Sequence, residues 1–502
     1  MISNRLFGEV LRKCFKNGTF PERIVVALSG GVDSLCLTYL LGQFKRIYKP
    51  SLQITAITID HKYRAGSGKE AEKVGVLVRP WGVKHIVKTL EYEDRDIGKI
   101  TNFEEVAREK RYDIFEQVCR ELDVKSLIVA HNLNDQIETF LQRLQQNSSI
   151  FGLVGLRTVD HLPISPTSPS ENGDSIHVVR PLLSFDKSEI IETCTKNGIR
   201  WFEDHTNSDI HLTRRNLLRH IVSEVVPHRL DNQDIPIEEC NALLLVSKES
   251  LVKTHNEILS LVCEMQHQIA NIENHLKLRG LFSLDKKNLL LTVSLPFNIL
   301  DTYNPMVLSR FFYQNMYLIS SVKHYHWSYA KLERHAIPKI LRFYNNNKEI
   351  SPPVSMKLTY LNVLFNIKLD THNKQMRISL TRQPLMRNEY SQVCLDCTLN
   401  DQWSDWFMFD RRYWIRLKLR NSDIKVSIVP YRHNDVAFRK QLNLAFKGSN
   451  NGPLLSILQE GTPVIVTYSH SGHFAALPTY NIYSQEDVID VEWLAKNNVH
   501  SL

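Results

Sequence analysis

The stretch ALSGGVDSL, residues 27–35, stands where an apolar run gives way to a helical pattern. The preceding IVV, residues 24–26, predicts a buried strand. Two adjacent glycines let the backbone turn tightly and approach an anion without a Cβ in the way. A helix that starts there presents free N–H groups and the positive end of its dipole. The stretch is therefore either a glycine turn in which Asp33 and Ser34 cap a helix, or a loop that holds a phosphate.

Length and composition restrict the class of protein. The chain has 502 residues, of which 43% are hydrophobic and 23% charged, so we expect two or three globular domains. No segment approaches 18 uninterrupted apolar residues, and no membrane partner is expected. The formal charge of +8 is compatible with a nucleic-acid partner without showing one. Eight cysteines without a repeated spacing predict a reducing compartment.

The N-terminal segment is basic and amphipathic. The first 20 residues contain a single acid, Glu9, and four cations, Arg5, Arg12, Lys13 and Lys16. The segment resembles a mitochondrial presequence, or it is the first structural helix beside the strand at residue 24. One segment can serve both purposes.

Short apolar strands alternate with helical patterns over the first 230 residues. We expect strands at residues 24–28, 53–60, 84–88 and 126–130, and helices at 33–41, 70–78, 103–122 and 187–197. This alternation predicts βαβ units and a parallel sheet covered on both faces. Ligands of such sheets bind beyond the carboxyl ends of the strands, where the glycine stretch lies.

The pattern changes twice along the chain. Residues 1–230 are expected to form the α/β domain, and residues 231–350 a helical middle region with its clearest periodicity from 237 to 284. Strand-like alternation dominates residues 351–502, which predicts a mixed α/β or mainly β C-terminal domain.

If the glycine stretch is a phosphate loop, its own residues bind the nucleotide. The predicted nucleotide-binding residues are Ser29, Gly30, Gly31, Val32, Asp33 and Ser34. The two serines add hydroxyl donors. The Asp33 carboxylate repels a bare phosphate, so its predicted use is to hold a Mg²⁺ ion that bridges the phosphates.

SGGxDS after a buried strand resembles the signature of the PP-loop ATP pyrophosphatases, which split ATP between its α and β phosphates. Four later segments resemble, in order, the tRNA(Ile)-lysidine synthetase family: IDHKYRAGSGKEAEKV at 59–74, NFEEVAREKRY at 102–112, AHNLNDQIETFLQRL at 130–144 and WFEDHTNSDIHLTRRNLLRH at 201–220. The resemblance covers about residues 24–228. It implies a Rossmann-like parallel sheet of the adenine nucleotide α-hydrolase type.

The resemblance also implies substrates and site residues. The substrates are ATP, used with Mg²⁺, free L-lysine and tRNA(Ile). The implied roles fall to Asp60 and His61 for ATP, Arg108 and Arg111 for the phosphates, Asp135 or Glu138 for the base, and Arg215, Asn216 and Arg219 for closing the site or touching tRNA.

Periodicity gives an independent view of two of these groups. On the helix expected at 103–122, Arg111 falls inside the apolar arc and Arg108 at its edge. An inward guanidinium needs an anionic partner, either the ATP phosphates or a buried carboxylate or carbonyl. Asp135 and Glu138 share a helix face. They form a capping box with Asp135 as N-cap, they face the substrate amine, or they do both.

Two positions depart from the family pattern, and the C-terminal part resembles it only weakly. Asn132 and Asn134 stand where His and Asp are usual, which puts a second metal ligand in doubt. In FDRRYWIRLKLRN, residues 409–421, Arg416 and Lys418 fall on one face of a strand beside aromatic residues. This face either binds tRNA phosphates or is an ordinary solvated strand face.

The resemblance implies a ligase that forms a carbon–nitrogen bond. The 2-oxygen of the wobble cytidine of a tRNA(Ile) with a CAU anticodon is adenylated with release of diphosphate. The lysine ε-amine then displaces AMP and gives lysidine. The alternatives are another PP-loop tRNA modification such as 2-thiolation, or an inactive tRNA-binding relative. Thiolases usually carry CxxC in the catalytic domain, whereas here it stands at 394–397. A mitochondrial member is expected, with the bacterial cytoplasm as the alternative, and the oligomeric state stays open.

Overall fold

The computed structural model divides the chain into two compact units. Unit 1 covers Met1–Ser165 and Glu171–Val262, and unit 2 covers Pro166–Ser170 and Cys263–Leu502. The structure describes residues 1–15, 20–60, 67–90, 103–162, 176–202, 214–221, 247–323, 325–350, 353–399, 401–419, 425–432, 436, 439–440, 442, 458–467, 473–483 and 489–496. No helix in these ranges is long and apolar enough to cross a membrane.

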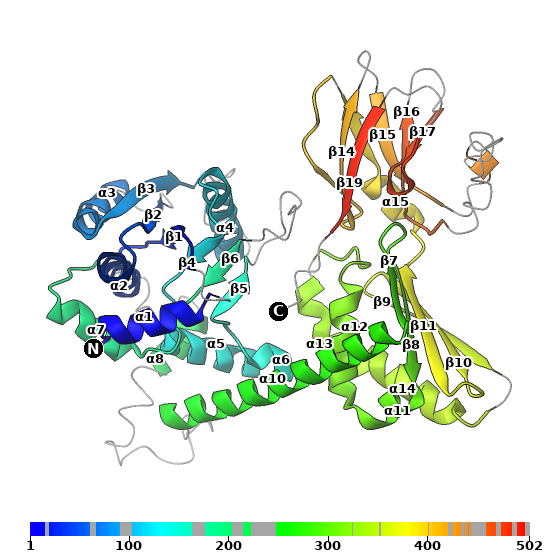
Figure 1. Cartoon of the computed structure of the whole chain (residues 1–502), viewed down its shortest axis with the longest axis horizontal. Coiled ribbons are helices and arrows are strands. Elements are labelled where there is room, and N and C mark those ends of the chain that lie inside the picture. The colour runs from blue at the N-terminus through cyan, green and yellow to red at the C-terminus, as the bar shows by residue number, and fades with distance from the viewer. Residues whose placement is uncertain are drawn as a thin grey trace. The chain divides into compact units, whose positions relative to one another are not determined.

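A six-stranded sheet, sheet A, forms the centre of unit 1 (Figure 1). Its order is β3-β2-β1-β4-β6-β5, from β1 (Arg23–Ala27), β2 (Gln53–Asp60), β3 (Val83–Thr89), β4 (Ser126–Ile128), β5 (Val159–His161) and β6 (His177–Val179). All neighbours pair in parallel except β5, which runs antiparallel to β6 at the edge. The predicted α/β class and parallel sheet are confirmed, and β5 was not expected.

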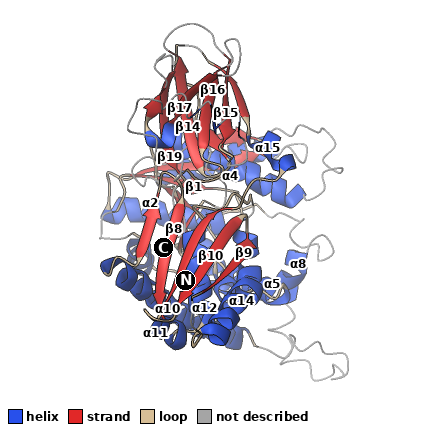
Figure 2. Ribbon diagram, turned by 90° about the vertical axis from the view of Figure 1, so that its right-hand side faces the viewer, coloured by secondary structure: helices blue, strands red, loops and turns tan. Residues whose placement is uncertain are grey.

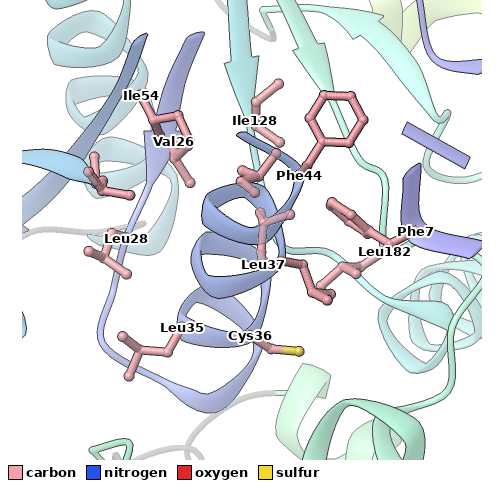
Figure 3. Close-up of a cluster of buried hydrophobic side chains, with 14 of the residues drawn as sticks. Phe7, Val26, Leu28, Leu35, Cys36, Leu37, Phe44, Ile54, Ile128 and Leu182 are labelled. Atoms are coloured by element: carbon pink, nitrogen blue, oxygen red, sulfur yellow. The ribbon is translucent and has the colours of Figure 1, made fainter. Parts of the chain in front are cut away.

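Helices cover both faces of sheet A. They are α1 (Asn4–Lys13), α2 (Val32–Tyr48), α3 (Ser67–Val78), α4 (Phe103–Glu121) and α7 (Lys187–Lys196). A further cluster joins α5 (Leu133–Gln145), α6 (Ile150–Leu153), α8 (Arg214–His220) and the start of α10 (Lys248–Leu278). Ile24 and Val26 of β1 belong to a core cluster with α1 and α2 (Figure 3), whereas Val25 packs with α4 on the other face. Because alternate strand residues point to opposite faces, both must be apolar, which explains the continuous apolar run.

Unit 2 is built on three antiparallel sheets (Figure 2). Sheet B has the order β7-β8-β11-β10-β9, from β7 (Phe282–Asp285), β8 (Leu290–Pro296), β9 (Val354–Tyr360), β10 (Val363–Asp370) and β11 (Gln375–Arg382). Sheet C has the order β12-β15-β16-β17-β18, from β12 (Leu395–Thr398), β15 (Lys425–Pro430), β16 (Pro463–Thr467), β17 (His473–Leu477) and β18 (Ile482–Tyr483). Sheet D joins β13 (Phe407–Phe409), β14 (Tyr413–Leu419) and β19 (Ile489–Ala495). The expected strand-rich C-terminal part is confirmed.

The middle of the chain is less helical than expected. It supplies α10, α11 (Phe297–Thr302), α12 (Pro305–Met316), α13 (Tyr329–Lys331) and α14 (Ile337–Asn347). It also supplies β7 and β8 to sheet B, so a helical pattern reaching residue 284 is wrong. The helix stops earlier because Gly280 adopts φ +66°, and the Leu281 N–H donates back to the Leu276 carbonyl at 2.8 Å. A left-handed glycine is a common helix terminator.

Candidate active site

The glycine loop links the carboxyl end of β1 to the start of α2. Gly30 adopts φ +86°, a left-handed conformation that L side chains rarely take. A Cβ on Gly30 would lie 2.8 Å from Val74 Cγ2 of α3. The Gly30 carbonyl accepts a hydrogen bond from the Phe202 N–H at 3.0 Å. The loop conformation therefore depends on glycine at this position.

Asp33 and Ser34 do not cap α2, so that alternative is wrong. The N-cap residue is Gly31, which has no side chain to offer to the helix. The Ser34 hydroxyl accepts from the Gly30 N–H at 3.1 Å and donates to the Gly31 carbonyl at 3.0 Å. The Ser29 and Ser34 hydroxyl oxygens lie 3.1 Å apart. Both serines therefore stabilise the loop by hydrogen bonds. The positive end of the dipole of the 17-residue helix α2 faces the loop, and no side chain caps this end of the helix.

Two side chains that the sequence did not single out as site residues hold the Asp33 carboxylate. Lys187 Nζ donates to Asp33 Oδ2 at 2.5 Å, and Asn132 Nδ2 donates to Oδ1 at 3.0 Å. Lys187 is the first residue of α7, and Asn132 is the N-cap of α5. Both follow shortly after parallel strands, β6 and β4, so their place at the carboxyl edge of the sheet was the available signal.

Asp135 caps α5 from inside the helix. Asn132 Oδ1 accepts from the Asp135 N–H at 3.2 Å, and Asp135 Oδ2 accepts from the Asn132 N–H at 3.0 Å. This is a capping box, but its N-cap is Asn132 and not Asp135 as predicted. The register is shifted by three residues because the asparagine that departs from the family pattern is itself a strong N-cap residue.

Glu138 lies one turn further along α5 and is paired with Arg219 of α8. Arg219 Nε lies 3.0 Å from Glu138 Oε1, and Nη2 lies 3.4 Å from Oε2. The Glu138 side chain is 4% exposed. A residue predicted to close the site thus forms a two-pronged ion pair with a predicted catalytic carboxylate.

Asn134 joins α5 to α10. Its Oδ1 accepts from Lys248 Nζ at 2.9 Å, and Lys248 also forms an ion pair with Asp186, the N-cap of α7. Burial acts to raise the pKa of Asp186, but hydrogen bonds from Lys248 and Ser188 bring it below its ordinary value. The second departure from the family pattern is therefore accommodated, because an amide oxygen suffices as the acceptor for Lys248.

A pocket of about 610 Å³ adjoins this network within unit 1. Leu133 and Asp186 contribute to it from α5 and the start of α7. The rest of its lining comes from one face of α10, namely Lys248, Glu249, Val252, Lys253, Asn256, Glu257 and Ser260. Its lining residues include charged side chains of both signs.

A buried arginine at the carboxyl edge of sheet A was not predicted. Arg180 follows β6 directly and is 3% exposed. Its Nε donates to His131 Nδ1 at 3.2 Å, and its Nη1 donates to the Arg157 carbonyl at 2.7 Å. Burial lowers the pKa of Arg180. An arginine immediately after a buried strand was the signal that could have found it.

The other predicted site residues of unit 1 are placed in part. Arg111 is half-buried on α4, and Arg108 is exposed, with its guanidinium 5.2 Å from the ring centroid of Tyr112. Asp60 is buried at the end of β2. His61 lies outside the described residues, as do the side chains of Arg215 and Asn216 on α8.

The loop fits a nucleotide phosphate better than it fits a free-standing metal ion. Among the described residues, no group of three or more His, Cys, Asp or Glu side chains could hold a metal. A Mg²⁺ ion on Asp33 would thus take its other ligands from phosphate oxygens and water, as this ion prefers. The left-handed glycine and the free helix N-terminus are the features that an anionic phosphate requires.

Arg416 and Lys418 lie in unit 2, on β14. Arg416 Nε donates to Glu492 Oε2 at 2.7 Å, and its guanidinium lies 5.0 and 4.7 Å from the ring centroids of Trp403 and Trp406. Lys418 stands opposite Asp490 in the ladder. The rings beside Arg416 thus come from Trp403 and Trp406 and not from the expected Tyr413 and Trp414 of the same segment, and each cation has a carboxylate residue of β19 opposite it in the ladder.

The chain is similar to several known proteins. The family described as the PP-loop domain matches residues 5–226. A probable tRNA(Ile)-lysidine synthase of Schizosaccharomyces pombe is 23% identical over 83% of this chain and 82% of its own length. A tRNA(Ile)-lysidine synthase of Rickettsia rickettsii is 34% identical over 39% of this chain and 37% of its own length. A solved structure, the U34-tRNA thiolase NcsA from Methanococcus maripaludis, is 15% identical, with a TM-score of 0.36 over 51% of this chain and 78% of that chain.

Proposed function

We propose that this chain, a homologue of the tRNA(Ile)-lysidine synthases with a PP-loop domain at residues 5–226, is itself a tRNA(Ile)-lysidine synthase. The observation that carries the proposal is the extent of the fission yeast match, which runs over 83% of the chain and reaches beyond the PP-loop domain. The geometry of the glycine loop supports the ATP-binding part of the proposal.

The proposed reaction has two steps. ATP binds with its phosphates at the loop of residues 29–34, and the 2-oxygen of the wobble cytidine attacks the α-phosphorus while diphosphate leaves. The ε-amine of free lysine then attacks carbon 2 of the base, and AMP leaves with the former 2-oxygen. The attacking nitrogen loses a proton to a carboxylate, Asp135 or Glu138.

The residues of the site share the electrostatic work. Asp33 is the proposed ligand of Mg²⁺, which would neutralise phosphate charge when bound. Arg108 and Arg111 are proposed to stabilise the charge that develops as diphosphate leaves. Asp60 and His61 are proposed to contact the nucleotide, and Arg215, Asn216 and Arg219 to close the site or contact tRNA.

The test is incorporation of labelled lysine into tRNA. Purified chain, ATP, Mg²⁺ and tRNA(Ile) with a CAU anticodon should give acid-precipitable label, and a tRNA(Ile) with a GAU anticodon is the matched control. Lysine-independent release of diphosphate without any label in tRNA would favour another PP-loop modification such as 2-thiolation. Neither label nor diphosphate would favour an inactive tRNA-binding relative. Asp33→Ala should abolish both products.

The C-terminal part is proposed to bind tRNA through β14. A phosphate must compete with Glu492 for Arg416 and with Asp490 for Lys418, so the contribution of each cation is expected to be small. Lys418→Ala should lower the slope of log affinity against log salt by a measurable amount of at most about one unit, measured with tRNA(Ile) by fluorescence anisotropy. An unchanged slope would remove Lys418 from the interface.

We propose the mitochondrion as the site of action. The support is the basic amphipathic segment that forms α1, with Arg5, Arg12 and Lys13 on it. A fluorescent protein fused after the full chain should co-localise with a mitochondrial dye, and replacing these three cations by glutamine should reduce that co-localisation. Diffuse fluorescence from the unaltered fusion would contradict the proposal.

A further inference from the structure

Lys187 occupies a particular place at the glycine loop. It begins α7, and its ammonium reaches across to the first turn of α2, where it bonds Asp33 at 2.5 Å. Both side chains are only partly exposed, 34% for Lys187 and 28% for Asp33. The ammonium group therefore lies beside the helix end at which an anion would bind.

The loop does not need this ion pair to keep its shape. The serine hydroxyls and the Phe202 N–H already hold its backbone, and Asn132 already holds Asp33. A pair of partly exposed charges contributes little to stability. A structural purpose for Lys187 is thus weakly supported by the contacts around it.

A second lysine near the site, Lys248, differs from Lys187 because it already has two partners outside the glycine loop. Lys248 Nζ is engaged by both Asp186 and Asn134. That arrangement fixes the residue just before Lys187, since Asp186 is the N-cap of α7. The backbone from which Lys187 extends is anchored, while its own side chain ends in a flexible ammonium group with three donors.

We propose that Lys187 is a phosphate ligand of the ATP site, held in position by Asp33 until a nucleotide binds. When a nucleotide binds, the Lys187 ammonium exchanges its carboxylate partner for a phosphate oxygen, and Asp33 would then be the residue to hold a cation. No bond other than hydrogen bonds is made or broken, and no proton is transferred. The inference rests on the ATP site of the proposed function but not on lysine or tRNA as substrates.

Nucleotide binding without tRNA tests this. Isothermal titration calorimetry with α,β-methylene-ATP and Mg²⁺ should show Lys187→Met binding about 10- to 100-fold more weakly than the unaltered chain, the range of one lost charge-assisted hydrogen bond. Lys187→Arg should recover part of the affinity. Lys196→Met is the matched control, because Lys196 lies on the same helix and pairs with Glu192 at the surface. It should bind as the unaltered chain does.

Adenosine separates phosphate binding from a structural effect. A variant with a distorted loop should lose affinity for adenosine and for the nucleotide alike, whereas loss of a phosphate ligand should leave adenosine binding unchanged. Equal nucleotide affinity for Lys187→Met and the unaltered chain overturns the proposal, and so does a parallel loss of adenosine binding. Failure of the unaltered chain to bind the nucleotide overturns the ATP site together with it. Normal nucleotide binding without lysine incorporation would contradict the proposed function alone.

Discussion

Two of the carboxylates proposed for the site, Asp33 and Glu138, have different surroundings. Asp33 is partly exposed and is held by an ammonium and an amide that can exchange partners. Glu138 is buried on α5, with both oxygens facing the guanidinium of Arg219. A buried carboxylate is stable only while a partner compensates its charge. The Glu138–Arg219 pair therefore has a structural part in unit 1 whatever its part in the reaction.

Removing Arg219 should expose that dependence. Arg219→Ala removes the guanidinium that faces the buried Glu138 carboxylate, and we expect a loss of about 2–3 kcal/mol in the free energy of unfolding. Adding Glu138→Gln to this variant should restore part of the loss. The measurement is denaturant unfolding of the four proteins of the double-mutant cycle.

An exposed pair provides the comparison. Arg23 and Asp123 form an ion pair at 3.3 Å whose side chains are 48% and 78% exposed. Arg23→Ala should cost less than about 1 kcal/mol. If Arg219→Ala costs no more than Arg23→Ala, the burial argument for Glu138 is wrong.

At the scale of residues, the sequence predicted which residues belong to the site but not which residues they contact. The resemblance selected Asp33, Asp135 and Glu138, but it gave no partner for any of them. Their partners Lys187 and Arg219 are 154 and 81 residues away in the chain. Such pairs depend on how β4, β6 and their following helices assemble, and a one-dimensional pattern does not encode that assembly. Asn132 and Asn134, which stand where the family usually has His and Asp, are an N-cap and a hydrogen-bond acceptor.

Among the elements, α1 shows how one segment can satisfy two requirements. Its apolar side buries Phe7 and Leu11 completely in the core of unit 1. Its basic side includes Arg12, whose guanidinium lies 4.8 Å from the ring centroid of Tyr48 on α2. The same amphipathic pattern that resembles a presequence is thus the pattern of a helix packed on a domain. Packing confirms that α1 is a structural helix and leaves its targeting role a proposal.

Phe7 should contribute strongly to stability. Phe7→Ala removes a fully buried ring and leaves a cavity, so we expect a loss of about 3–5 kcal/mol in the free energy of unfolding. Leu6→Ala, one residue earlier on the same helix and 44% exposed, should change it by about 0.5 kcal/mol or less. Thermal unfolding of the full chain, followed by calorimetry, measures both. Similar shifts for the two variants would contradict the packing of α1.

Elements of unit 1 were predicted more accurately than those of the middle region. The alternation of apolar strands and helices located β1 to β4 within a few residues because a parallel sheet buries both faces of each strand. The short edge strand β5 has intermediate exposure throughout and gives no such signal. α10 ends at Leu278 because Gly280 adopts a left-handed conformation, although the apolar periodicity of the sequence continues past this glycine.

At the scale of the whole molecule, unit 2 is joined by a buried cluster of charges. Asp410, in the β13–β14 turn, accepts from Arg382 Nε at 3.2 Å and from Arg412 Nε at 2.7 Å. Lys496, directly after β19, donates to the Ser320 carbonyl at 2.6 Å. Burial, with Arg412 nearby, lowers the pKa of Lys496 to about 7. Sheet B, sheet D and the segment after α12 therefore meet at one group of ionisable residues.

The stability of the chain should depend on pH through Lys496. In the unfolded chain this lysine keeps its proton up to a pKa of 10.5, whereas the folded chain releases it near pH 7. Between these values the unfolded state binds more protons, so stability rises with pH by up to about 1.4 kcal/mol per pH unit. Below pH 7 both states are protonated and this contribution is constant.

A substitution isolates this contribution from other titrating groups. Lys496→Met should remove the rise between pH 7 and pH 9, measured as the difference in free energy of unfolding between variant and unaltered chain. Lys425→Met, at an exposed lysine on β15, should leave the rise intact. Parallel pH profiles for the Lys496 variant and the unaltered chain would contradict the lowered pKa.

Sequence reasoning gave the composition of unit 2 but not its organisation. The strand-like alternation expected over residues 351–502 is clearest at 413–420, 424–429 and 462–468, and these segments correspond to β14, β15 and β16. It did not predict that β8, from the middle of the chain, would pair with β11. The order of strands in an antiparallel sheet depends on which edges meet in three dimensions, and the alternation carries no information on that.

The pairing of β14 with β19 has a consequence for how the protein is synthesised. The two strands are joined along their whole length, from Tyr413–Ala495 to Leu419–Ile489. Leu419 and Ile489 are 70 residues apart in the sequence. At a translation rate of about 5–20 residues per second, β14 waits roughly 4–14 s on the ribosome for its partner. During that time one edge of β14 is unpaired, and such an edge can pair with other chains. We expect chaperones to protect this edge of the nascent chain during that interval.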